Sequence, residues 1–137
     1  MSILDGSCLC GGVRFRVTAP FAGFHHCHCH TCRKAHATVY GSSAVVPAPA
    51  LEFLQGRERL KAFESSPGKK RWFCGECGSH VYAAYDDRPG EVVLRVGLLD
   101  DTGGQRAHAH IWLSHKPSWY QVNDDLERFD GPPPGEA

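Results

Sequence analysis

Cysteine spacing constrains this chain more than any other feature. Seven cysteines fall into three short clusters, and neighbours within a cluster are separated by one or two residues. The full set is Cys8, Cys10, Cys27, Cys29, Cys32, Cys74 and Cys77. Two thiolates at such spacing can bind one metal ion, because a short turn directs both sulfurs to one point. Zinc takes four protein ligands in a closed structural site and three in a catalytic site that keeps one position open. The count therefore fits one site of each kind.

The sequence favours metal ligands or redox groups over a disulfide framework. Residues 1–6 contain no basic segment followed by an apolar stretch, so no secretory signal peptide is predicted. The odd number of cysteines fits disulfides poorly, and the geometry of a disulfide disfavours a bond between Cys8 and Cys10. Free buried cysteines are the simpler alternative. The expected compartment is a reducing cytoplasm.

Length and charge narrow the class of protein further. The 137 residues are enough for one domain, and 42% of them are hydrophobic, which supports a modest core. Fifteen basic and fifteen acidic residues cancel, which argues against nucleic-acid binding, although Lys69–Arg71 form a local basic patch. No apolar run approaches the roughly 18 residues of a membrane span.

Short alternating segments separated by glycine and proline predict a mainly β fold. Residues 12–18 place Val13, Phe15 and Val17 on one face of a strand, and strands are also expected over 39–46, 91–96 and 108–113. Residues 51–54 and 60–63 are predicted to form a hairpin around Gly56. Residues 71–85 predict another hairpin with the third cysteine cluster at its tip, and residues 31–37 predict a short helix. We expect one domain over residues 1–130 and a disordered tail over 131–137.

Two of the clusters are suited to a shared structural zinc. Cys74 and Cys77 are followed by Gly78, and Cys8 and Cys10 are followed by Gly11, as tight metal-binding turns require. These two pairs would make a closed four-cysteine site that stabilises the fold. A rival partition would combine Cys8, Cys10, Cys27 and Cys29.

The second cluster can hold a metal from one side. Cys27, Cys29 and Cys32 lie within six residues and leave the fourth position to water, a substrate or a histidine. The candidate histidines are His25, His26, His28, His30, His36, His80, His108, His110 and His115. Three thiolates make zinc a weaker Lewis acid than three histidines do, whereas a coordinated thiol is fully deprotonated. An open site would therefore favour a thiol substrate.

The chain resembles the glutathione-dependent formaldehyde-activating enzyme (GFA) family, which shares its domain with the centromere protein V group. The matching segments are GSCLCGGV (6–13), CHCHTCRK (27–34), RWFCGECGS (71–79), HIW (110–112) and KPSW (116–119). The resemblance implies a small single-domain β fold like that of Mss4, with two zinc ions. It assigns the structural zinc to Cys8, Cys10, Cys74 and Cys77. It assigns the catalytic zinc to Cys27, Cys29 and Cys32.

The same resemblance implies a carbon–sulfur lyase that joins glutathione, or another small thiol, to formaldehyde and gives S-hydroxymethylglutathione. The partners would be a small-molecule thiol and an aldehyde. Basic residues that could pair with the glutathione carboxylates are Arg33, Lys34, Lys69, Lys70 and Arg71, although a solvated surface explains each of them as well. Trp72, Trp112, Trp119 and Tyr120 could line a pocket or fill the core. His110 is expected to be a hydrogen-bonded structural histidine. No residue is assigned as general acid or base.

Two other functions fit the same cysteines. A zinc-stabilised binding module without catalysis would have its second site closed by a histidine. A thiol-redox or metal-buffering protein would lose zinc when Cys27, Cys29 or Cys32 is oxidised.

Overall fold

The computed structural model describes residues 3–134 and confirms a mainly β fold. The chain divides into two compact units, each built from two separate stretches of sequence. The first unit runs up to Gly23 and resumes over Ala44–Gln105. The second comprises Phe24–Ser43 and the stretch from Arg106 onward. The prediction of one zinc domain over 1–130 stays a prediction.

The first unit contains a three-stranded antiparallel sheet with the order β1-β2-β5. Its strands are β1 (Leu4–Ser7), β2 (Arg14–Val17) and β5 (Leu51–Gln55). Val13, Phe15 and Val17 are fully buried, as their alternation predicts. Burying such side chains stabilises the fold by about 1.5–3 kcal/mol each, and this sheet face therefore contributes strongly to the core.

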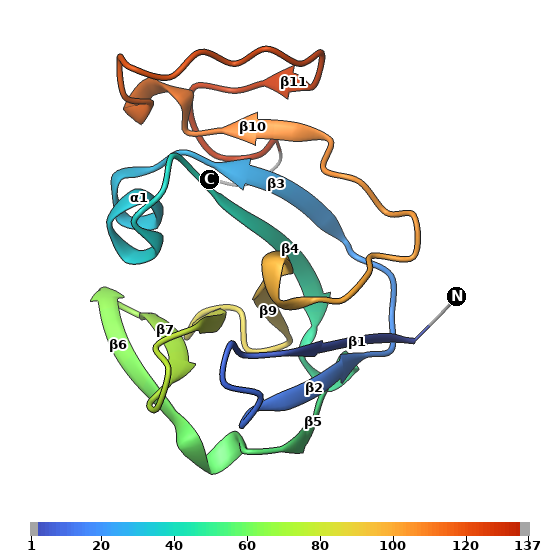
Figure 1. Ribbon diagram of the computed structural model, residues 1–137. Helices are drawn as coiled ribbons and strands as arrows, with labels where there is room; N and C mark the ends of the chain where they lie inside the picture. The colour runs from blue at the N-terminus through green and yellow to red at the C-terminus, as the bar shows by residue number, and fades with distance from the viewer. Residues whose placement is uncertain (1–2, 135–137) are drawn as a thin grey trace. The chain divides into compact units, whose positions relative to one another are not determined.

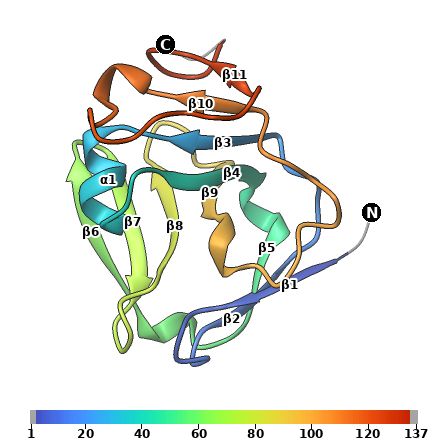
Figure 2. The same ribbon diagram turned by 45° about the horizontal axis from the view of Figure 1, so that its top comes forward.

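A second run of strands in the first unit has the order β4-β9-β8-β7-β6. These are β4 (Gly41–Pro47), which begins in the second unit, β9 (Glu91–Arg95), β8 (His80–Tyr85), β7 (Lys69–Cys74) and β6 (Leu60–Ser66). Figure 2 shows β7 and β8 running side by side as an antiparallel pair. The predicted hairpin over 71–85 is therefore confirmed, and Cys74–Cys77 form its turn.

The second unit is smaller and combines strands with the described α-helix. Its strands have the order β11-β10-β3-β4, and β10 (Ala109–Ile111) runs parallel to both β3 (Gly23–Cys27) and β11 (Glu127–Arg128), as Figure 1 shows. The helix α1 (His30–His36) follows β3 directly. Among residues 3–134, no helix is both long enough and apolar enough to cross a membrane.

Four short 3-10 helices connect the strands of the described chain. They are η1 (Ala48–Ala50), η2 (Arg57–Arg59), η3 (Val96–Leu98) and η4 (Leu113–His115).

The predicted hairpin between residues 51–54 and 60–63 is wrong. β5 pairs with β2, whereas β6 pairs with β7, so the two strands belong to different sheets. Gly56 explains the divergence, because it has a φ of 80° and is followed by η2. The chain therefore changes sheets at Gly56 instead of folding back on itself.

Part of the proposed tail has a defined contact. The Trp112 N–H donates to the Gly131 carbonyl at 2.9 Å. Residues 135–137 lie outside the described residues. Disorder over 131–137 stays a prediction.

Gly56 should tolerate substitution far less than another glycine with positive φ. A Cβ there would overlap the Gly12 carbonyl oxygen and lie 2.9 Å from the Val13 Cα, whereas at Gly104, with a φ of 86°, it would meet no atom within 4 Å. We expect Gly104→Ala to cost about 1 kcal/mol and Gly56→Ala about 3 kcal/mol, measured by urea unfolding of the metal-loaded protein. Equal losses in the two variants would contradict this account of Gly56.

Candidate functional site

Two turns of the first unit bring four cysteine sulfurs together. Cys8 and Cys10 follow β1, while Cys74 ends β7 and Cys77 lies in the turn after it. The four Sγ atoms all lie within 4.8 Å of one another. Cys8 Sγ is 3.5 Å from Cys10 Sγ, which is 3.9 Å from Cys74 Sγ. A zinc tetrahedron with 2.3 Å bonds has edges of about 3.8 Å. The spacing therefore fits a metal, while a disulfide requires about 2.05 Å between the sulfurs.

Backbone geometry supports both turns of this group. Gly11 and Gly78 have φ values of 76° and 80°, which glycine adopts without the strain of a Cβ. The Val13 N–H donates to Cys8 Sγ at 3.2 Å. Ser79 Oγ accepts from the Leu9 N–H at 2.9 Å and thus links the two turns.

Ser79 also affects the chemistry of this group. Its Oγ lies 3.3 Å from Cys77 Sγ. This hydrogen bond, together with the Ser79 N–H, lowers the pKa of Cys77 to about 5. Cys77 is therefore ready to act as a thiolate at neutral pH, which is the form that binds metals.

The second unit holds the other three cysteines, and α1 explains how they converge. Cys27 ends β3 and Cys29 caps the N-terminus of α1. The Cys29 sulfur accepts the backbone N–H of Cys32 at 3.4 Å, as an N-cap oxygen does in other helices. Because the cap bonds to the third helical residue, the Cys29 and Cys32 side chains face each other. All three Sγ atoms lie within 4.8 Å of one another.

Burial and hydrogen bonding make these three thiols unequal. Cys27 and Cys32 are buried against Ala109 and Ile111, whereas Cys29 is partly exposed. Hydrogen bonds from Cys27 and Cys32 hold the pKa of Cys29 well below its ordinary value. The same contacts raise the pKa of Cys27 far above its ordinary value. A cation would remove this conflict, because it would stabilise all three thiolates together. The donor set therefore fits zinc.

The structure gathers the cysteines in the two groups that the sequence predicts. Within residues 3–134, neither group combines Cys8 and Cys10 with Cys27 and Cys29, and no histidine joins either group. Their roles as ligands stay a prediction. Free cysteines are found at all seven positions.

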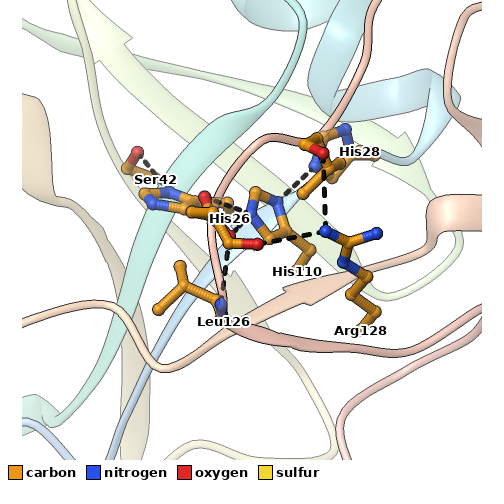
Figure 3. Close-up of polar contacts among 8 residues, drawn as sticks. His26, His28, Ser42, His110, Leu126 and Arg128 are labelled. Atoms are coloured by element: carbon orange, nitrogen blue, oxygen red, sulfur yellow. Dashed lines mark hydrogen bonds and ion pairs between the residues drawn. The ribbon is translucent and has the colours of Figure 1, made fainter.

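A histidine network lies beside the three-cysteine group and was not predicted as a unit. His28 and His110 are fully buried, and their rings are joined by a 2.8 Å hydrogen bond (Figure 3). His110 also bonds to Asp124, so its ring is buried and hydrogen-bonded as expected, while its structural role stays a prediction. Only the CHCH pattern at 27–30 could have drawn attention to His28, and nothing in the sequence marked Asp124.

The second unit also contains an open cleft with a volume of about 230 Å³. It is lined by Arg33, Lys34, Ala37, Thr38 and Trp119. Arg33 donates to the His115 carbonyl at 3.0 Å, and Trp119 is 70% exposed. The cleft thus combines two cations with one aromatic surface. Trp119 is accordingly not a core residue, whereas Trp72 packs against the core of the first unit.

Comparison with known proteins gives the class of this protein. The family model described as glutathione-dependent formaldehyde-activating enzyme matches residues 3–115. A Halomonas elongata protein whose name assigns it provisionally to this enzyme type is 33% identical over 130 residues, covering 88% of this chain and 81% of its own. An uncharacterized lyase of Schizosaccharomyces pombe is 22% identical over 125 residues, covering 91% and 89%.

A solved structure agrees with these relatives. The crystal structure of a Rhodobacter sphaeroides protein superposes with a TM-score of 0.60 and 27% identity, covering 74% of this chain and 90% of the other. The chain belongs to the glutathione-dependent formaldehyde-activating enzyme family.

Metal analysis of two variants can test the ligand sets. We predict two zinc ions per chain in the wild type and one in both Cys74→Ser and Cys29→Ser. Cys74→Ser should also unfold at much lower urea concentration, because a closed structural site contributes folding energy directly. Cys29→Ser should keep its fold. Elemental analysis and circular dichroism measure both properties, and a single zinc in the wild type would contradict the prediction.

Proposed function

We propose that this protein is a zinc-dependent carbon–sulfur lyase that combines glutathione with formaldehyde. The observation that carries the proposal is the group of three converging sulfurs at Cys27, Cys29 and Cys32 in a member of this family. A three-ligand group without a described histidine is typical of a catalytic site with one open position. The four-cysteine group would hold the structural zinc.

The cysteine group defines the chemistry that this site can support. Zinc bound by three thiolates would supply a fourth position that takes up a thiol as its thiolate. Cys29 is the partly exposed member of the group, so a substrate can approach from its side. Cys27 and Cys32 are buried against the apolar residues Ala109 and Ile111, so their sulfurs are less accessible than that of Cys29.

The proposed reaction needs little from other side chains. The thiolate sulfur attacks the carbonyl carbon, one carbon–sulfur bond forms, and the carbonyl π electrons move to the oxygen. The oxygen then takes a proton from solvent. The proton released by the thiol balances this step. A separate general acid or base is therefore not required of the chain.

Glutathione is favoured by the charge of the cleft beside α1. Arg33 and Lys34 directly follow Cys32 in sequence and line this cleft. A tripeptide thiol with two carboxylates can pair with such cations, and its backbone can pack against Trp119. An uncharged thiol would lack the charge interaction.

The cytoplasm is the compartment that suits this chemistry. Seven free cysteines need a reducing environment, and the same environment supplies free thiol substrates. We therefore place the protein, its two zinc ions and its small-molecule partners there.

Exchange NMR offers a direct test of the activity. Glutathione and formaldehyde interconvert with their adduct without help, so the acceleration over buffer must be measured at equilibrium. We expect wild type to increase the exchange rate in proportion to its concentration, and Cys29→Ser to give the buffer rate. Lys61→Ala, an exposed substitution in the first unit, serves as the control. Wild type with two zinc ions but no acceleration would overturn the proposed activity.

Removal of one cation should reveal the carboxylate contact. We expect Lys34→Ala to raise the KM for glutathione about fivefold, the equivalent of about 1 kcal/mol for an exposed ion pair. The KM for 2-mercaptoethanol, which carries no carboxylate, should not change. Lys61→Ala should leave both values as in the wild type. Equal increases for the two thiols would contradict the proposed role of Lys34.

A further inference from the structure

A hydrogen-bonded series of three side chains, Asp124, His110 and His28, leads from the surface of the second unit to the turn between Cys27 and Cys29. Asp124 Oδ2 lies 2.9 Å from His110 Nε2, and His110 Nδ1 lies 2.8 Å from His28 Nε2. Figure 3 shows His110 between His28 and the residues around Leu126. The Asp124 side chain is 43% exposed, whereas both histidines are fully buried. This series of hydrogen-bonded side chains is therefore exposed to solvent at Asp124 and buried at His28.

The carboxylate sets the direction of the first hydrogen bond. Contact with His110 holds the pKa of Asp124 below its ordinary value, so Asp124 is ionised at neutral pH. An ionised carboxylate only accepts hydrogen bonds, so His110 Nε2 must carry the proton that lies between them. The Leu126 N–H also donates to Asp124 Oδ1 at 3.1 Å, which fixes the carboxylate in place.

The hydrogen bond between His110 and His28 also has a defined direction. Within residues 3–134, His28 Nδ1 has no partner for a proton, whereas His28 Nε2 lies 2.8 Å from His110 Nδ1, so the ring proton of His28 belongs on Nε2. His110 Nδ1 therefore accepts from His28 Nε2, and His28 Nδ1 is left without a proton. This nitrogen is buried and has no hydrogen-bond partner within residues 3–134. A proton on this nitrogen would leave a buried N–H donor without a hydrogen bond, which is costly in a folded protein.

Two ring contacts and one backbone hydrogen bond restrain His28. The ring packs at 5.0 Å from Tyr40 and at 6.1 Å from Tyr120, measured between ring centroids. The His28 backbone N–H donates to the Ile111 carbonyl at 3.0 Å. Both the ring and the backbone of His28 are therefore tied to the segment around His110.

His28 occupies a position that matters for the cysteine group. It is the single residue between Cys27 and Cys29, so its backbone determines how these two sulfurs are directed. A ring held at its far end restricts the φ and ψ angles of the turn. In metalloproteins, loss of an outer group that orients the ligands typically weakens metal binding about 10–100-fold.

We propose that Asp124 and His110 are positioning residues that act through His28. Their hydrogen bonds hold His28 as the Nε2–H tautomer and keep the Cys27–Cys29 turn in the arrangement that binds the metal. This proposal rests on the proposed function for the assignment of a metal to Cys27, Cys29 and Cys32. The tautomers themselves do not depend on that assignment.

Long-range ¹H–¹⁵N NMR spectra distinguish protonated from unprotonated ring nitrogens and therefore test the proposed tautomers of His28 and His110 directly. We expect Nε2–H and unprotonated Nδ1 for both His28 and His110 in the wild type. Asp124→Ala should give a mixture of tautomers at His110. Asp125→Ala, its exposed neighbour, should keep the wild-type pattern. A proton on His28 Nδ1 in the wild type would overturn the proposal.

Metal affinity tests the positioning role. Competition with a chelator should show about tenfold weaker binding at the three-cysteine group in Asp124→Ala, and no change in Asp125→Ala. The four-cysteine group, in the other unit, should keep its affinity in both variants and so report on the fold. Equal affinities at the three-cysteine group in the two variants would overturn the positioning role.

A conservative exchange provides the rescue. His110→Gln keeps an N–H for Asp124 and an oxygen acceptor for His28, whereas His110→Phe keeps the bulk alone. The glutamine variant should bind the metal more tightly than the phenylalanine variant. Equal weakening in the two variants would contradict the positioning role of the Asp124–His110–His28 hydrogen bonds. A wild type without metal at this group would overturn the proposed function and the positioning role, whereas the NMR spectra would still decide the tautomers.

Discussion

The mutual proximity of the sulfur atoms is the constraint on which the rest of the structure depends. Four sulfurs lie within 4.8 Å of one another in the first unit, and three do so in the second. Thiolates at such distances repel one another strongly unless a cation lies among them. The hairpin of β7 and β8 and the turn after β1 both end at the first group, and α1 begins at the second. The ends of these strands and of α1 thus form the turns that hold the two cysteine groups.

Local features of the chain were predictable, whereas the pairing of its strands was not. Val13, Phe15 and Val17 alternate and are buried, and Cys74–Cys77 form the tip of a hairpin, because both properties arise within a few residues. The hairpin prediction for β5 was wrong because its actual partner, β2, lies far away in sequence. No local feature of residues 51–63 shows that β5 pairs with β2. Gly56 does adopt a positive φ, but a glycine at this position is equally compatible with a hairpin turn.

The candidate site divides in the same way. The grouping of the cysteines followed from spacing and from the family resemblance, since each cluster is short. The contact between His28 and His110 joins residues 82 positions apart. His110 could be recognised as a buried polar residue, but its partners could not be named. Asp124 stands in a segment without periodicity, so only the folded chain shows that it contacts His110.

The division of each unit into two stretches has a consequence for synthesis on the ribosome. Cys8 and Cys10 leave the exit tunnel well before Cys74, from which Cys10 is separated by 64 residues. Until that segment emerges, the nascent chain carries several thiols without their final neighbours. Closing so long a loop is slow compared with forming a local turn. The early cysteines are therefore exposed to oxidation until their final neighbours emerge, and the redox state during translation would affect the yield of native protein.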